Sequence, residues 1–373
     1  MHSGAAALDL TPKLQRALEG SNALLPLPID DERRAALLSS TLRVGEPIAD
    51  DIAIVMATSG STGSPKGALL SGSALAASAA ATHDRLGGPG RWLLTLPTHH
   101  IAGLQVLVRS LYAGTTPVAL PPDFEASELP SAVKNLGSGR RYASMVSVQL
   151  AKALADPAAA AALAELDAVL IGGGPIPPEL NESALAAGVS VIRTYGMSET
   201  AGGCVYDGLP LDGVRLRLGD DGRIALGGPT LASGYRNPVD PSPFSDGWFL
   251  TDDIGAVDDS RTLQVLGRVD DTIATGGLKV LPVLVESALA SHPSIAECGV
   301  FGVPDERLGQ RVVVAVVLAP GAAAPTIAEL RQHISLTLAA TAAPREVHVV
   351  AELPRRGIGK LDRPALAARF GQS

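Results

Sequence analysis

Short apolar, β-rich runs alternate with stretches of helical period between residues 50 and 196, and this alternation limits the fold more than any other feature. The expected strands are 50–57, 115–120, 143–148, 167–174 and 189–196, and the expected helices are 71–87, 103–114, 149–166 with a break at Pro157, and 177–188. Strands that alternate with helices form parallel sheets in layered α/β domains, where ligands bind beyond the carboxyl ends of the strands. Glycine-rich stretches at 58–67, 172–174 and 196 each follow a strand, so we expect them to converge on one edge.

The pattern changes after about residue 205. Residues 214–228 predict a hairpin with Asp221-Gly222 in its turn, and 248–267 predict a second hairpin. The remainder predicts helices near 282–291 and 325–339 and strands at 295–303, 311–318 and 346–351. The predicted fold class is therefore α/β. A large N-terminal α/β layered domain with an antiparallel β subdomain occupies residues 1–267, and a small mobile α+β domain occupies 268–373.

Composition excludes several classes of protein. The net charge of −8 comes without any basic run, which argues against nucleic-acid binding. The only cysteines, Cys204 and Cys298, form no CxxC pattern, which suits a reducing cytosol better than a disulfide framework or a zinc site. No apolar run reaches the ~18 residues of a membrane span. We predict a cytoplasmic protein; the sequence leaves open whether it is a homodimer.

The stretch "TSGSTGSPKG" (58–67) contains three glycines, several hydroxyl side chains and Lys66. Glycines allow close approach of a ligand, and successive backbone N–H groups can bind an anion. This composition suits a phosphate-binding loop, and it equally suits a flexible Gly/Ser surface loop. A Walker A loop is excluded, because Lys66 follows Pro65 and precedes Gly67 instead of preceding Ser or Thr.

The stretch 58–67 closely resembles the phosphate loop of the adenylate-forming enzymes, which include acyl-CoA synthetases, luciferases and the adenylation domains of peptide synthetases. Four later motifs of that family match in order: "TYGMSET" (194–200), "GWFLTDDIG" (247–255), "GRVDDTIATGGLKV" (267–280) and "LPRRGIGKLDR" (353–363). The resemblance spans about residues 50–365. Members usually carry a longer region before the phosphate loop than the roughly 50 residues found here.

The resemblance implies that a carboxylate attacks the α-phosphorus of ATP. Glu199 would bind Mg²⁺, Thr200 would donate to the α-phosphate, and the Gly196 backbone would face the acyl carboxylate. The residues implied for the β- and γ-phosphates are Thr58, Ser59, Gly60, Ser61, Thr62, Gly63 and Lys66.

The remaining nucleotide contacts are also implied by the resemblance. Tyr195 would offer a flat face to the adenine, and the backbone of Gly173, Gly174 and Pro175 would lie on its other side. The ribose would be bound by Asp253 and Arg268. Asp252 stands where the family usually has glycine.

Asp270 matches the family's hinge, about which the small domain rotates between an adenylating and a thioester-forming state. Lys360 would then bridge the carboxylate and the α-phosphate in the first state. In the second state Gly276, Gly277 and Lys279 would line the tunnel for coenzyme A. A solvated surface lysine is the alternative for Lys360.

The segment "LPTHHIAGLQVL" (96–107) carries adjacent histidines. A metal site is not indicated, because no third ligand stands at a suitable spacing. In the family this position gates the acyl pocket, and His100 aligns with it better than His99.

The segments 97–111 and 144–150 and the short chain most resemble the branch of the family that ligates 2-succinylbenzoate to coenzyme A in menaquinone synthesis. Arg109 is a weak candidate for pairing the second carboxylate, and an arginine on that helix can equally be structural. Other readings are a fatty-acid or benzoate ligase, a peptide-synthetase module, and a nucleotide-binding protein without turnover.

Overall fold

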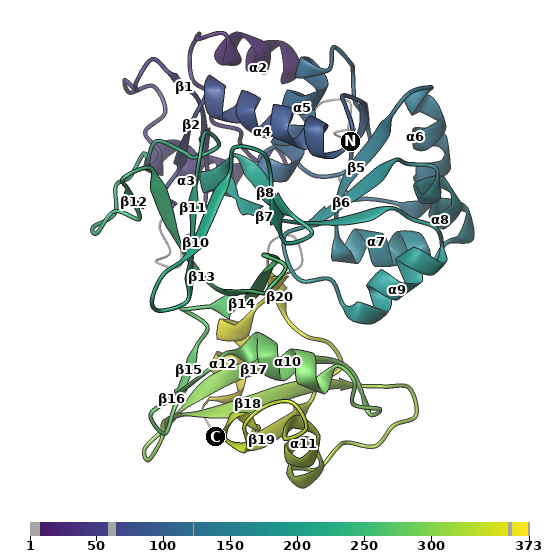
Figure 1. Cartoon of the computed structure of the whole chain (residues 1–373), viewed down its shortest axis with the longest axis vertical. Helices are drawn as coiled ribbons and strands as arrows, with labels where there is room; N and C mark the ends of the chain where they lie inside the picture. Colours follow the sequence, from purple (N-terminus) through teal and green to yellow (C-terminus); the bar gives the residue numbers. More distant parts are fainter. Residues whose placement is uncertain (1–7, 59–64, 122, 357–359, 372–373) are drawn as a thin grey trace. The chain divides into compact units, whose positions relative to one another are not determined.

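The computed structural model describes residues 8–58, 65–121, 123–356 and 360–371, with the side chains of Arg356 and Lys360 left out (Figure 1). The chain divides into two compact units. The first unit comprises Met1–Arg217, Ala225–Thr251 and Asp259–Thr262, and the second comprises Leu218–Ile224, Asp252–Asp258 and Leu263–Ser373. Within the described ranges no helix is both long enough and apolar enough to cross a membrane.

The helices are α2 (Thr11–Leu18), α3 (Glu32–Thr41), α4 (Gly72–Arg85), α5 (Ile101–Tyr112), α6 (Leu129–Leu136), α7 (Ser147–Leu154), α8 (Pro157–Ala164), α9 (Pro178–Ala186), α10 (Pro282–Leu289), α11 (Ile327–Ile334) and α12 (Arg363–Phe370), with 3₁₀ turns η1 (Ala126–Glu128), η2 (Ser198–Thr200) and η3 (Ala340–Ala342). The strands are β1 (Ile52–Met56), β2 (Ala68–Ser71), β3 (Arg91–Leu94), β4 (Val118–Ala119), β5 (Arg141–Val146), β6 (Ala168–Gly172), β7 (Val191–Met197), β8 (Gly202–Tyr206), β9 (Leu209–Pro210), β10 (Arg215–Leu218), β11 (Arg223–Gly227), β12 (Phe244–Ser245), β13 (Trp248–Val257), β14 (Leu263–Arg268), β15 (Ile273–Thr275), β16 (Leu278–Val280), β17 (Ile295–Asp305), β18 (Gly309–Leu318), β19 (Glu346–Val349), β20 (Arg355–Arg356) and β21 (Lys360–Leu361).

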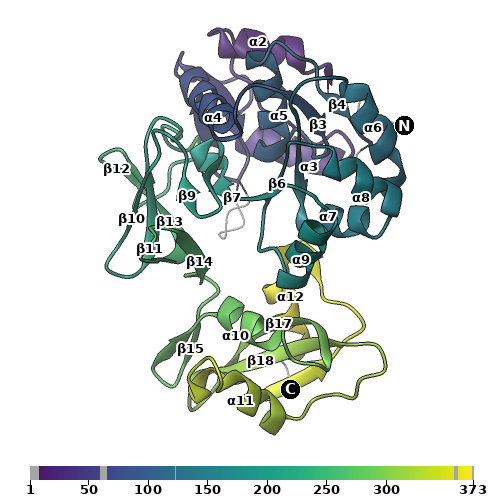
Figure 2. The same cartoon turned by 45° about the vertical axis from the view of Figure 1, so that its right-hand side comes forward.

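A seven-stranded sheet in the order β4-β3-β5-β6-β7-β8-β9 forms the centre of the first unit. Its strands from β4 to β7 are parallel, and β8 and β9 add antiparallel pairs at one end. The alternation of strands and helices predicted parallel strands, but it gave no strand at β3, which lies between β4 and β5. Neighbouring residues of β3 enter different cores: Trp92 packs with the α4 and α5 side chains, and Leu93 with those of α6, α7 and α8. The sheet is therefore covered by helices on both faces (Figure 2).

The strand before the phosphate loop differs from the expectation. β1 pairs antiparallel with β2 in a separate two-stranded sheet, with Val55 opposite Leu69. We predicted that all three glycine-rich stretches follow strands of the parallel sheet. For 58–67 this prediction is wrong, because the strands on either side of it, β1 and β2, form a separate hairpin. A parallel crossover needs a dozen or more residues and usually a helix, which this Gly/Ser segment does not supply.

Both predicted hairpins are present in the antiparallel region. The first contains β10 and β11, and its turn has Gly222 at φ +78°. In the second, β13 pairs with β14 from Asp253 opposite Arg268 to Val257 opposite Leu263. This five-stranded sheet has the order β10-β11-β13-β12, with β14 paired to β13. Residues 218–224, 252–258 and 263–268 of this region are assigned to the second unit.

The rest of the second unit is an α+β structure, as predicted. Its sheet has the order β16-β15-β18-β17, with β19 parallel to β18. Side chains from α10 and α11 pack on one face of this sheet, whereas Leu366 of α12 packs with Phe301 in a separate core.

Gly196 at the β7–β8 bulge has φ +159°, and a Cβ placed there would lie 2.1 Å from the Gly202 carbonyl oxygen. We expect Gly196→Ala to lower the free energy of unfolding by about 1–3 kcal/mol, because the backbone must move to admit the methyl group. The control is Gly174→Ala, where a Cβ meets no atom within 4 Å. Thermal unfolding measures both variants, and equal melting of Gly196→Ala and the wild type would contradict the expected clash.

Candidate active site

Glu199 lies in a tightly bonded turn between β7 and β8. The Met197 N–H donates to Thr200 Oγ1 at 3.0 Å, and that hydroxyl lies 2.7 Å from the Gly202 carbonyl, to which it donates. Ala201 follows with φ +52°, so the chain reverses sharply. The turn holds Glu199 at 8% exposure. The Thr200 hydroxyl is fully buried in shaping this turn, so its donation to an α-phosphate stays a prediction.

The segment 232–237 connects the Glu199 turn to the β1–β2 hairpin through its backbone. The Ala232 N–H donates to the Glu199 carbonyl at 2.8 Å. Further along, the segment bonds to residues 66–69: Ser233 N to Leu69 O at 3.0 Å, Leu69 N to Gly234 O at 2.9 Å, Arg236 N to Gly67 O at 2.8 Å and Asn237 N to Lys66 O at 3.0 Å. These bonds bring together Lys66 and Glu199, which are far apart in sequence.

Tyr235 joins the two charged side chains. Its hydroxyl donates to Glu199 Oε1 at 2.7 Å, and the Lys66 Nζ lies 5.4 Å from the centroid of its ring. We refer to these three residues as the Lys66–Tyr235–Glu199 cluster. A half-buried ammonium near a buried carboxylate can bind a polyphosphate together with its counter-cation.

One end of the predicted phosphate loop is also held by this segment. Asn237 Nδ2 donates to the Pro65 carbonyl at 3.0 Å and to the Thr41 carbonyl at 2.9 Å. Thr58 Oγ1 is buried without a hydrogen-bond partner in the described part of the chain, which suits a group that binds a ligand. The predicted phosphate ligands Ser59, Gly60, Ser61, Thr62 and Gly63 lie outside the described residues.

The donor set fits magnesium bound together with a nucleotide. No group of three or more His, Cys, Asp or Glu side chains able to hold a metal occurs among the described residues. Magnesium commonly takes one or two carboxylates and completes its shell with phosphate oxygens and water. Glu199, with one oxygen already bonded to Tyr235, can supply such a carboxylate.

The predicted adenine site is formed by two neighbouring strands. β6 and β7 pair through Ile171 and Arg193, and a Cβ on Gly172 would lie 2.6 Å from Thr194 Oγ1. The structure thus brings the end of β6 next to the strand that carries the half-buried Tyr195. Gly173 adopts φ +82°, and the exposed Gly173, Gly174 and Pro175 follow β6.

His99 and His100 lie immediately before α5. Their ring centroids are 4.4 Å apart, and burial lowers the pKa of His99 below its ordinary value. Helix α5 runs close to the segment before the histidines, because Gly103 leaves room there: a Cβ at Gly103 would lie 2.3 Å from the Pro97 carbonyl oxygen. Contact of His100 with an acyl group stays a prediction.

Arg109 of α5 lies in the core of the first unit. Its guanidinium carbon lies 4.9 Å from the Trp92 ring centroid, Nη2 donates to the Tyr206 hydroxyl at 3.3 Å, and the residue is 3% exposed. Burial lowers its pKa, and the Tyr206 hydroxyl opposes that effect. The structural alternative is therefore favoured over binding of a second carboxylate.

Within the second unit, Arg268 is bound by three carboxylates. It donates to Asp253 at 3.1 Å, to Asp270 at 3.2 Å and to Asp252 at 3.5 Å. Burial lowers the pKa of Arg268, but the carboxylates outweigh burial and raise it overall. The predicted ribose pair, Asp253 and Arg268, is thus in direct contact with the predicted hinge residue. Asp252 also pairs with Arg223 at 3.0 Å.

The remaining predicted residues of this unit lie at turns. Gly276 (φ +57°) and Gly277 (φ +80°) form the two-residue turn between β15 and β16, and Lys279 is exposed on β16. The Lys360 backbone lies in β21, opposite Arg356 of β20, and its side chain lies outside the description.

Arg363, which begins α12 just after Lys360, fixes that helix within the second unit. Nη2 lies 2.7 Å from each Glu286 oxygen, Nη1 donates to Asp271 at 3.3 Å, and Nε donates to the Val300 carbonyl at 3.0 Å. Burial raises the pKa of Glu286 above its ordinary value, and the charge of Arg363 opposes that rise.

We expect Arg363→Leu to lower the free energy of unfolding by about 3 kcal/mol, because it leaves the Glu286 carboxylate largely buried and unpaired. The double variant Arg363→Leu/Glu286→Leu should recover part of the loss, since it removes the unpaired charge. Denaturant unfolding measures both. A single variant as stable as the wild type would contradict a stabilising role for this ion pair.

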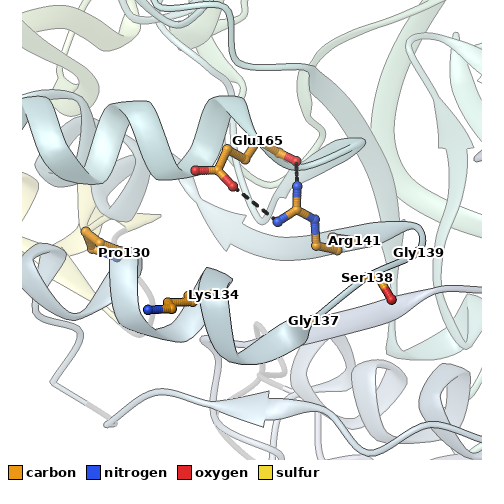
Figure 3. A pocket seen from close by; sticks show the side chains of 7 residues that line it. All are labelled: Pro130, Lys134, Gly137, Ser138, Gly139, Arg141 and Glu165. Carbon is orange, nitrogen blue, oxygen red and sulfur yellow. Dashed lines mark hydrogen bonds and ion pairs between the residues drawn. The ribbon is translucent and has the colours of Figure 1, made fainter.

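A surface pocket of about 560 Å³ lies elsewhere in the first unit, where α6 ends and β5 begins (Figure 3). Arg141 points across it to Glu165, with Nη1 3.2 Å from a carboxylate oxygen and Nη2 2.6 Å from the backbone carbonyl. None of the predicted site residues lines this pocket.

Sequence reasoning missed Tyr235, Arg236 and Asn237. Gly234 and Pro238 flank them and indicate only a turn, and no periodic pattern marks their side chains. Their function depends on a pairing with residues 66–69, which lie far away in the sequence. No local signal predicts such a pairing.

Two family models match the chain: the AMP-binding enzyme model over residues 9–236 and the AMP-binding enzyme C-terminal domain model over residues 284–360. A "probable 2-succinylbenzoate–CoA ligase" of Mycobacterium tuberculosis is 61% identical over 374 residues, which cover 99% of this chain and 97% of the relative.

Solved structures of the o-succinylbenzoate CoA synthetase of Bacillus subtilis are also similar. One holds the acyl-adenylate intermediate; it is 31% identical with a TM-score of 0.73, over 84% of this chain and 69% of that one. Another holds ATP and a magnesium ion; it is 31% identical with a TM-score of 0.72, over 84% and 70% of the two chains.

Proposed function

The chain belongs to the family of AMP-binding enzymes, and we propose on that basis that it ligates 2-succinylbenzoate to coenzyme A. It is an AMP-forming acyl-CoA ligase, and its small-molecule substrates include ATP and coenzyme A. The observation that carries the choice of acid is the 61% identity, over nearly the whole of both chains, to the mycobacterial relative named for that reaction.

The reaction proceeds in two half-reactions. In the first, an oxygen of the substrate carboxylate attacks the α-phosphorus of ATP, and pyrophosphate leaves as the acyl-adenylate forms. In the second, the thiol sulfur of coenzyme A attacks the acyl carbon, the thiol loses its proton, and AMP leaves. The products are the acyl-CoA thioester, AMP and pyrophosphate.

Residues of the first unit bind the phosphates in the first half-reaction. Lys66 supports the negative charge that develops on the leaving pyrophosphate, and Glu199 holds Mg²⁺ with the nucleotide. The bound Mg²⁺ would neutralise part of the negative charge of the phosphates. The backbone that follows β6 and the ring of Tyr195 bind the adenine between them. In such transfers, positioning and charge stabilisation provide most of the catalysis.

Residues of the second unit act in both half-reactions. Asp253 accepts hydrogen bonds from the ribose hydroxyls, and Arg268 orients Asp253. Lys360 neutralises charge on the carboxylate and α-phosphate during adenylation. Residues 268–373 then rotate about Asp270, and the turn with Gly276, Gly277 and Lys279 contributes to the coenzyme A tunnel. The domain boundary between residues 1–267 and 268–373 is part of this proposal.

The proposal includes a cytoplasmic location and an oligomeric state. Cys204 and Cys298 are free thiols, which suits the reducing cytoplasm, and burial raises the pKa of each to about 12. A homodimer is the oligomeric state to be tested against a monomer, by light scattering at working concentration.

The test of the function is release of AMP from ATP in the presence of coenzyme A and one acid at a time. 2-Succinylbenzoate is expected to give AMP and its thioester in equal amounts, and omission of coenzyme A should stop turnover after the adenylate forms. Turnover only with octanoate or benzoate would assign a fatty-acid or benzoate ligase. Nucleotide binding without AMP release from any acid would reject an enzymatic function.

A further inference from the structure

We propose that Tyr235 is a positioning residue for the magnesium carboxylate, and that it acts through its hydroxyl on Glu199. The inference rests on the proposed role of Glu199 in holding Mg²⁺ with the nucleotide. It does not depend on which acid the enzyme activates.

The hydroxyl is placed to fix one oxygen of the carboxylate. It donates to Glu199 Oε1 at 2.7 Å, a short distance typical of an O–H···O⁻ hydrogen bond. Such a bond restrains the position of the oxygen that accepts it and so limits the orientations open to the carboxylate. Residues that hydrogen-bond metal ligands in this way typically change metal affinity or activity by 10–100-fold when removed.

The position of Tyr235 is itself set from both sides. The Leu69 N–H donates to the Gly234 carbonyl and the Arg236 N–H donates to the Gly67 carbonyl, which anchors the chain on either side of Tyr235. Its ring packs edge-on to Phe244 with centroids 5.3 Å apart. These contacts restrict where the hydroxyl can lie, so its bond to Glu199 Oε1 favours one orientation of the carboxylate.

The ring also contacts the other charge of the site. Lys66 Nζ lies 5.4 Å from the ring centroid, within the distance of a cation–π interaction. Tyr235→Phe retains this contact and the packing on Phe244 while it removes only the hydroxyl. That substitution separates the effect on Glu199 from any effect on Lys66.

The experiment measures the dissociation constant of a non-hydrolysable ATP analogue by calorimetry, with and without Mg²⁺. Tyr235→Phe is expected to reduce the strengthening of binding by Mg²⁺ about tenfold. Binding without Mg²⁺ should stay within about twofold of the wild type, since Lys66 and the ring remain. The control is Tyr142→Phe, which removes a buried hydroxyl that donates to the Leu86 and Gly88 carbonyls.

A double-mutant cycle tests whether Tyr235 acts through Glu199. Glu199→Gln should reduce the Mg²⁺ effect more than Tyr235→Phe does, and the part that remains should be the same in Glu199→Gln/Tyr235→Phe. Equal Mg²⁺ effects in Tyr235→Phe and Tyr142→Phe, or independent losses in the cycle, would overturn the proposal. If the wild type binds the ATP analogue equally well with and without Mg²⁺, both the role of Tyr235 and the metal role of Glu199 are wrong. If the enzyme does not turn over 2-succinylbenzoate, only the proposed substrate is wrong.

Discussion

Lys360→Ala is expected to slow formation of the acyl-adenylate by about 10²–10³-fold, because it removes a preorganised cation from the position where negative charge develops. Thioester formation from supplied acyl-adenylate should stay close to the wild-type rate. In the proposed mechanism Lys360 acts only in the adenylating state, and Arg363, three residues further on, still anchors α12 through Glu286.

The two half-reactions are measured separately, by pyrophosphate exchange and by release of AMP from the purified adenylate. Lys152→Ala is a matched control, because Lys152 is exposed on α7 and outside the proposed site. An equal fall in both half-reactions would show that Lys360 does not act specifically in adenylation.

Asp270→Pro should have the opposite effect: adenylation persists, and transfer to coenzyme A falls by at least about 10²-fold. Proline fixes φ near −65° and so should prevent the backbone rotation that the proposed change of state requires. The substitution also removes the ion pair between Asp270 and Arg268, which measures 3.2 Å.

Asp270→Asn separates these two causes, because it removes the charge and keeps the backbone free to rotate. The same half-reaction assays apply, with melting temperature as a check of folding. If Asp270→Pro transfers the acyl group at the wild-type rate, residues 268–373 do not rotate about this position.

The parallel arrangement of β4, β5, β6 and β7 was predictable because strands and helices alternate there, with glycine or proline at their boundaries. Neither the four-residue strand β3 nor the reversal of β1 was predicted. The five residues of β1 are all buried, a pattern typical of a parallel strand as well as of this hairpin. Only the register with β2, in which Val55 lies opposite Leu69 and Met56 opposite Ala68, reveals the antiparallel arrangement.

The site was predictable as far as its motifs extend. Glu199, Lys66 and Asp253 lie in stretches that resemble the family, whereas Tyr235 lies in none of those five stretches, and its role arises from tertiary contacts. For Arg109 the sequence suggested a site residue that the structure places in the core. A charged residue on a helix suggested a ligand contact, but the guanidinium is buried against Trp92 and Tyr206, which no local pattern indicates.

The most direct test of the substrate is the ratio of kcat/KM for 2-succinylbenzoate to kcat/KM for its monoester, in which the carboxylate that is not activated is masked. A site that binds this second carboxylate with buried donors should favour the free acid by about 10⁴-fold, since the ester leaves those donors unpaired. Arg109→Leu should leave the ratio unchanged, because Arg109 lies in the core. Equal kcat/KM values for the acid and its monoester, or for octanoate or benzoate, would contradict the assignment to 2-succinylbenzoate.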